Sequence, residues 1–119
     1  MMIRESGIVL FTEHYEKAVE FYQAVLKLEI RERKDKLTIF NFGKSYLMVE
    51  DKGFASPVEK DRKMNPTVLR LDILDFEDTI SSIRAMDIKI TVDTYSWGRI
   101  GILLDTEGNR IELKDVSYK

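Results

Sequence analysis

The chain has 119 residues, of which 44% are hydrophobic and 34% charged, and a formal net charge of −2, which together predict one soluble globular domain. The charge provides no basic field for a nucleic acid, and no apolar run approaches the roughly 20 residues that a membrane span needs. The chain has no cysteine for disulfides or thiol chemistry, and its first residues lack the apolar core of a signal peptide, so a cytoplasmic protein is expected.

The first half of the chain predicts a strand, a helix and three further strands. Residues 8–11 form a short apolar run typical of a buried strand. Apolar residues then recur with helical spacing from Tyr15 to Leu26, and Thr12 or Glu13 is expected to cap that helix. A strand begins around Leu28, and residues 37–42 and 46–50 form a hairpin around Gly43 and Lys44.

A polar connection covers residues 51–65 and contains Gly53 and Pro57. This length would suit a lid or a segment that contacts a partner. A mobile linker between two modules is the favoured interpretation.

The second half predicts the same order of elements. A strand at residues 67–73 precedes a helix that opens at Asp75, whose carboxylate suits the positive end of the helix dipole. A strand at 88–92 follows, and residues 99–104 and 110–116 form a closing hairpin.

The two halves are also related residue by residue. Leu10, Tyr15 and Val19 correspond to Leu71, Phe76 and Ile80, each at a spacing of 61 residues. A repeat of this length predicts two copies of one supersecondary unit that face each other across a cleft.

The sequence contains the pair Phe21-Tyr22, the run Trp97-Gly98-Arg99 and the ending Asp105-x-x-Gly108-Asn109-x-x-Glu112-Leu113. These motifs resemble the vicinal oxygen chelate superfamily, which includes glyoxalases, extradiol dioxygenases, fosfomycin-resistance enzymes and bleomycin-resistance proteins. The resemblance covers nearly the whole chain and implies a single α+β domain over residues 1–119. Two βαβββ modules, 6–50 and 66–117, would form a curved eight-stranded mixed-sheet trough with helices outside.

The resemblance also implies where metal ligands would lie. In metal-dependent members they occupy four cavity-facing positions, which fall here on Gly7, Met48, Glu112 and close to Val68. Only Glu112 has ligand chemistry, with Glu50 on the same face as Met48, and the chain has a single histidine for zinc or iron. We therefore expect no metal and no other cofactor; if a metal binds, Glu112 and Glu50 would hold it.

Strand alternation assigns side chains to the trough. The predicted lining combines apolar and charged residues: Val9, Phe11, Tyr46, Met48, Glu50, Arg70, Asp72 and Glu112. This mixture predicts a small-molecule ligand with anionic or aromatic groups.

Arg70 is the leading candidate for ligand binding, because a guanidinium in a partly apolar cleft can bind a carboxylate, sulfate or phosphate. An equally expected alternative is that Arg70 pairs with Glu112 or Asp72 to cancel charge. Trp97, near Tyr95, could stack on a flat ligand or serve as a packing or dimer contact.

Glu112 is a candidate general base. Burial would raise the pKa of its carboxyl, whereas a neighbouring Arg70 would lower it.

These residues favour a metal-independent small-molecule-binding protein of the glyoxalase/bleomycin-resistance type, and the resemblance implies a homodimer. One alternative is a glyoxalase-like lyase or isomerase that uses Glu112, with Glu50 and a divalent metal. Another is a protein interaction module whose trough is filled by its own side chains.

Overall fold

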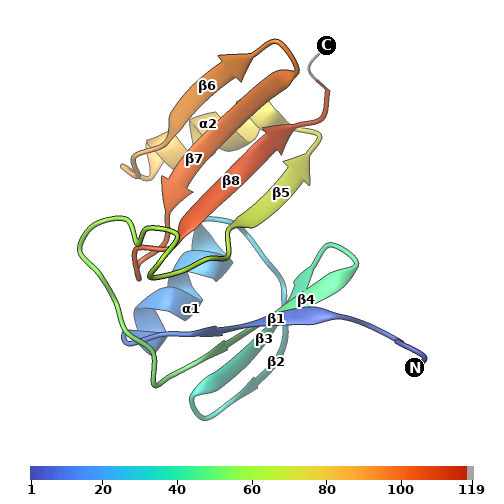
Figure 1. Cartoon of the computed structure of the whole chain (residues 1–119), viewed down its shortest axis with the longest axis vertical. Helices are drawn as coiled ribbons and strands as arrows, with labels where there is room; N and C mark the ends of the chain where they lie inside the picture. Colours follow the sequence, from blue (N-terminus) through green and yellow to red (C-terminus); the bar gives the residue numbers. More distant parts are fainter. Residues whose placement is uncertain (118–119) are drawn as a thin grey trace. The chain divides into compact units, whose positions relative to one another are not determined.

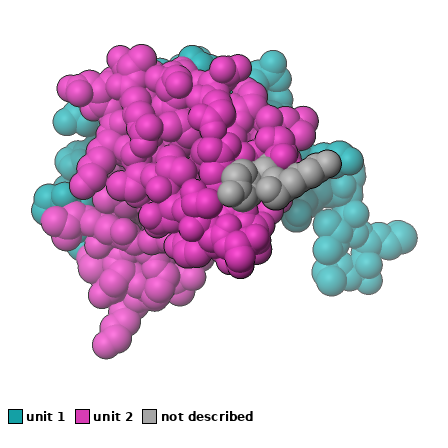
Figure 2. Space-filling view, turned by 90° about the horizontal axis from the view of Figure 1, so that it is seen from above, with its two compact units in different colours: residues 1–57 teal, residues 58–119 magenta. Residues whose placement is uncertain are grey.

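The computed structural model describes residues 1–117 and divides into two compact units, residues 1–57 and 58–119 (Figure 2). The first unit contains β1 (Gly7–Phe11), α1 (Tyr15–Ala24), β2 (Ile30–Lys34), β3 (Leu37–Phe42) and β4 (Ser45–Glu50). The second contains β5 (Leu69–Ile73), α2 (Phe76–Ala85), β6 (Thr91–Tyr95), β7 (Gly98–Leu104) and β8 (Arg110–Asp115). The predicted α+β fold with two βαβββ modules is confirmed (Figure 1).

Each unit is built on a four-stranded mixed sheet with the same topology. The strand orders are β1-β4-β3-β2 and β5-β8-β7-β6, and in both sheets the first strand pairs in parallel with the last strand of the module. Both ends of α2 lie 61 residues after those of α1, so the internal repeat is a structural repeat. The joining of the two sheets into one trough stays a prediction.

The core of the first unit lies between α1 and one face of its sheet. Ala18 and Tyr22 of the helix and Leu47 and Val49 of β4 are almost fully buried, and removal of these apolar surfaces from water stabilises the unit. The Tyr15 hydroxyl shares a buried 2.6 Å hydrogen bond with Thr38 Oγ1, which satisfies both polar groups.

The second unit buries the corresponding face against α2. Ile83 of the helix and Ile111 and Leu113 of β8 are almost fully buried. Gly101 of β7 allows this close packing, because a Cβ there would lie 2.9 Å from Ile80 Cδ1. Neither helix in the described part of the chain has the length and apolar character of a membrane span.

Helix α1 begins later than the sequence predicts. His14 is its N-cap, and neither Thr12 nor Glu13 has that role. The backbone N–H and the hydroxyl of Thr12 both donate to the Glu50 carbonyl, at 2.7 and 2.8 Å, so Thr12 extends the sheet. The Glu13 carboxylate accepts a 2.9 Å hydrogen bond from the N–H of Ala55. Asp75 is the N-cap of α2, as expected.

The largest boundary difference concerns β6, which covers Thr91–Tyr95 where the sequence predicts a strand at 88–92. Cross-strand pairing decides this, because residues Thr91 to Tyr95 pair in register with Ile102 to Gly98 of β7. Trp97 consequently lies in the turn of the β6–β7 hairpin.

The polar connection is hydrogen-bonded along its length. Gly53 N–H donates to the Thr12 carbonyl at 2.9 Å in the first unit. In the second unit, Lys60 N–H donates to the Gly108 carbonyl and Asn65 Nδ2 to Asn109 Oδ1, both at 2.8 Å. The connection therefore has defined contacts with the elements beside it.

Candidate functional site

The second sheet has a charged face on the side opposite α2, made by alternate residues of β5 and β8. Its members are Arg70, Asp72, Arg110, Glu112 and Lys114. The parallel register places Arg70 opposite Glu112 and Asp72 opposite Lys114. Alternation along the strands predicts this face, because the intervening side chains are buried in β8 and buried or half-buried in β5.

Glu112 is held between two guanidinium groups. Arg70 Nε and Nη2 donate to its Oε1 at 3.1 and 2.9 Å, and Arg110 Nε donates to its Oε2 at 2.9 Å. The Glu112 side chain is 14% exposed, whereas that of Arg70 is 44% exposed. The expected Arg70–Glu112 ion pair is therefore present, and Asp72 is not the partner of Arg70.

Arg70 keeps donor capacity in this arrangement. Its Nη1 makes no hydrogen bond within residues 1–117, and the side chain is nearly half exposed. Since a guanidinium has five N–H donors, the pair with Glu112 orients Arg70 and leaves donors for an anion.

The two arginines also decide the chemistry of Glu112. Partial burial raises the pKa of its carboxyl, but the hydrogen bonds and charges of Arg70 and Arg110 outweigh this effect and hold the pKa below the ordinary value. A carboxylate with a lowered pKa is a weak base, so the geometry does not favour Glu112 in proton abstraction.

The lowered pKa of Glu112 predicts an acid dependence of stability. Because the folded-state pKa lies below the unfolded value, the stabilising contribution is present above pH 4.5, the ordinary value, and is lost as the pH falls through the folded-state pKa. Urea unfolding between pH 7 and 3 should therefore show that the parent loses its advantage over Glu112→Gln at low pH. The matched control is Glu20→Gln, at an exposed position of α1. A difference in stability between parent and Glu112→Gln that stays constant across this pH range would contradict the assignment.

The first sheet has an apolar face opposite α1, made by Val9, Phe11, Tyr46 and Met48 with Glu50 at one end. Val9 and Phe11 are 43% and 54% exposed. The register pairs Val9 with Met48 and Phe11 with Glu50, and Tyr46 lies two residues before Met48. The five predicted lining residues of the first module therefore lie together on this sheet.

The ring of Tyr46 covers Gly7 on the apolar face. A Cβ built at Gly7 would overlap the Tyr46 ring atoms, so glycine lets the ring lie in this position. The Arg31 guanidinium lies 5.8 Å from the centre of the same ring, held by two 2.8 Å hydrogen bonds to Glu5. The sequence did not predict a role for Arg31 or Glu5, because no local pattern brings them to Tyr46.

The residues at the four inferred metal-ligand positions do not fit a metal ion. Gly7 offers no donor and its space is filled by the Tyr46 ring, while Met48 and Val68 lack oxygen or imidazole ligands. Glu112 is already bound by two arginines. Within residues 1–117, no three histidine, aspartate or glutamate side chains form a cluster that could hold an ion.

Trp97 lies apart from the Arg70–Glu112 pair. Its ring stacks on that of Tyr95, with centres 5.0 Å apart and planes at 2°. The hairpin pairs Tyr95 with Gly98, whereas Glu112 lies opposite Ile102, four residues further along β7 and roughly 13 Å away. The stacked rings are about half exposed at the end of the sheet.

Arg110 is a site residue for which the sequence predicted no role. It lies two residues before Glu112, so both side chains leave β8 on the same side. That spacing was the available signal for its contact with Glu112.

The sequence of the chain matches a known family over most of its length. The profile of the Glyoxalase/Bleomycin resistance protein/Dioxygenase superfamily matches residues 6–113. The chain belongs to this superfamily. No curated protein sequence matches the chain.

Solved structures share the fold of this superfamily member at low sequence identity. A virulence protein from Salmonella typhimurium is 20% identical, with a TM-score of 0.68 and coverage of 97% of this chain and 98% of that one. The E126Q mutant of the fosfomycin resistance protein FosX from Listeria monocytogenes, in complex with Mn(II) and 1S,2S-dihydroxypropylphosphonic acid, is 15% identical, with a TM-score of 0.75 and coverage of 96% and 90%. Lactoylglutathione lyase from Agrobacterium tumefaciens is 17% identical, with a TM-score of 0.74 and coverage of 93% and 92%.

Proposed function

We propose that this superfamily member is a metal-independent small-molecule-binding protein in which Arg70 binds an anionic group of the ligand. The observation that carries the proposal is the Arg70 guanidinium, which is oriented by Glu112 yet is 44% exposed and retains donors. The misfit of the four inferred ligand positions supports binding without a metal.

The apolar face of the first unit is a second surface suited to a ligand. Phe11 exposes an aromatic ring beside Val9. Met48, which lies opposite Val9 on β4, adds a flexible thioether side chain to the same face. These side chains favour aromatic or aliphatic groups.

The enzyme alternative, a glyoxalase-like lyase or isomerase, would require Glu112 to accept a proton. Two arginine partners lower the pKa of that carboxyl, which opposes the role. The exposed Arg70 side chain likewise favours ligand binding over an interaction module with a filled trough.

Arg70→Ala is expected to weaken the binding of phenyl phosphate and benzoate by roughly tenfold, because a charge-assisted hydrogen bond is lost. Affinities would be measured by NMR titration of the dialysed protein. The matched control is Arg33→Ala, since Arg33 is also 44% exposed and forms a 2.8 Å pair with Glu16, on the helix side of the first sheet.

Unchanged affinity in Arg70→Ala, or an equal loss in Arg33→Ala, would contradict the binding role of Arg70. Metal analysis of the same dialysed sample tests metal independence, and near-stoichiometric metal would overturn it. The native mass of the sample tests the homodimer that the family resemblance implies.

A further inference from the structure

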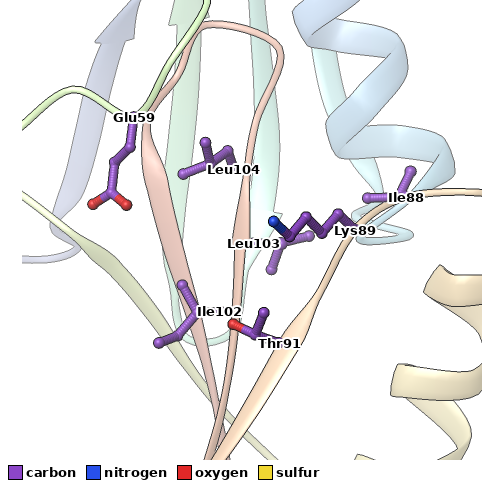
Figure 3. Close-up of a pocket in the computed structure, with 7 residues that line it drawn as sticks. All are labelled: Glu59, Ile88, Lys89, Thr91, Ile102, Leu103 and Leu104. Carbon is purple, nitrogen blue, oxygen red and sulfur yellow. The ribbon is translucent and has the colours of Figure 1, made fainter.

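The second unit contains a cavity of about 330 Å³ that uses neither Arg70 nor Glu112 (Figure 3). It lies where the connection, the segment before β6 and the end of β7 come together. The residues that line it are Glu59, Ile88, Lys89, Thr91, Ile102, Leu103 and Leu104. Its volume is at the small end of the roughly 300–1,000 Å³ that is usual for ligand pockets.

The wall of this cavity is mainly aliphatic, with one polar edge. Ile102 and Leu104 project from the face of β7 that carries Glu112 on the neighbouring strand. Figure 3 shows the Lys89 ammonium and the Thr91 hydroxyl directed toward the space beside Ile102 and Leu104. An apolar pocket with a few convergent polar groups is the usual form of a small-molecule site.

The cavity lining has one carboxylate, that of Glu59, and one ammonium, that of Lys89. The Glu59 carboxylate is neutralised from outside by Arg62 at 3.0 Å and by Arg110 at 3.8 Å. Lys89 forms no hydrogen bond or ion pair with any part of the chain that the structure describes. An ammonium without a partner at the edge of an aliphatic cavity is complementary to an anion that carries an apolar tail.

We propose that this cavity is a binding site for a small amphipathic monocarboxylate. The carboxylate pairs with the Lys89 ammonium and accepts a hydrogen bond from the Thr91 hydroxyl. The alkyl or aryl body replaces water against Ile102 and Leu104. This site goes beyond the proposed function at Arg70, because the partner of the Arg70 side chain, Glu112, does not line the cavity, and neither does Arg70 itself.

The test uses octanoate as the probe and octylamine as its charge-reversed analogue, titrated calorimetrically into the whole chain. Octanoate is expected to bind at least tenfold more tightly than octylamine. Affinity should rise roughly fourfold for each methylene from butanoate to hexanoate, since each group leaves water for an apolar wall. Failure of octanoate to bind, or equal binding of octylamine, would overturn the proposal.

Variants of Lys89 locate the anion. Lys89→Met is expected to weaken octanoate binding roughly tenfold, and Lys89→Glu should reverse the preference toward octylamine. Lys44→Met, at an exposed turn of the first unit, is the matched control and should leave octanoate affinity unchanged. The proposal fails if both methionine variants bind octanoate alike.

Nuclear Overhauser contacts locate the tail without any mutation. With methyl-labelled protein, the octanoate chain should give contacts to the Ile102 and Leu104 methyl groups. Contacts to Val9 alone would assign octanoate to the apolar face of the first unit and would overturn this site. Because this readout does not involve Arg70, failure here is distinguishable from failure of the proposed function.

Discussion

Asp105→Ala is expected to lower the free energy of unfolding of the second unit by about 3 kcal/mol. Asp105 is 7% exposed, and its Oδ1 accepts hydrogen bonds from the backbone N–H groups of Glu107 and Asn109, both at 2.8 Å. Its Oδ2 accepts a third bond from Asn109 Nδ2 at 3.0 Å. Alanine removes all of these acceptors and leaves buried donors unsatisfied, which costs more than the loss of a surface contact.

Asp105→Ala is also expected to disturb the charged face. The turn that contains Asp105 joins β7 to β8 and ends directly before Arg110. Asn109, which Asp105 holds, also accepts the 2.8 Å bond from Asn65 of the connection. Urea unfolding followed by the fluorescence of Trp97, the single tryptophan of the chain, reports on this unit.

Asp105→Asn is the matched control for that experiment. Asparagine keeps one carbonyl acceptor for the turn N–H groups, so a smaller loss of about 1 kcal/mol is expected. Equal losses in Asp105→Ala and Asp105→Asn would show that the carboxylate charge, rather than the acceptor geometry, stabilises the turn.

Gly7→Ala is expected to destabilise the first unit by about 2 kcal/mol. The added Cβ would overlap the ring of Tyr46, which lies across the β1–β4 pair and beneath the Arg31 guanidinium. The structure must therefore either shift the ring, which changes its contact with Arg31, or separate the strands.

A double-mutant cycle identifies the cause of this loss. If the overlap with Tyr46 is responsible, Gly7→Ala in a Tyr46→Ala background should cost less than about 0.5 kcal/mol. Urea unfolding followed by far-ultraviolet circular dichroism measures all four proteins of the cycle. Additive losses would contradict this explanation.

A second glycine provides the control for a change without overlap. Gly43 has φ +61° in the β3–β4 turn, and a Cβ added there would meet no atom within 4 Å. Gly43→Asn should therefore change stability little, since asparagine tolerates this conformation.

Local sequence patterns predicted most of the fold. The spacing of apolar residues predicted both helices, and alternation predicted which side chains leave each sheet on the side opposite its helix. The 61-residue repeat predicted that the second unit repeats the first, which the bounds of α1 and α2 confirm. Alternation also placed Arg70 of β5 and Glu112 of β8 on the side of the sheet opposite α2. Each of them lies between apolar residues that point toward the helix.

The ends of helices and strands that depend on hydrogen bonds to distant residues could not be predicted in this way. The N-cap falls at His14 because the backbone and side chain of Thr12 bind the carbonyl of Glu50, 38 residues away. Pairing with β7 extends β6 to Tyr95 and places Trp97 in a turn. Neither partner is visible in the local sequence, since hydrogen bonds between strands join residues far apart in the chain.

The sequence by itself therefore determined the element order, the repeat and the sidedness of Arg70, Glu112 and the apolar strand residues. Only the tertiary structure decided that Glu112 lies between two arginines, that Tyr46 covers Gly7, and that Lys89 lies at the edge of an aliphatic cavity. The physical reason is that periodicity records the direction in which each side chain leaves its own backbone. Strand register and side-chain conformation arise only when the elements pack together. They determine which groups each side chain contacts, and these contacts determine its charge state and chemistry.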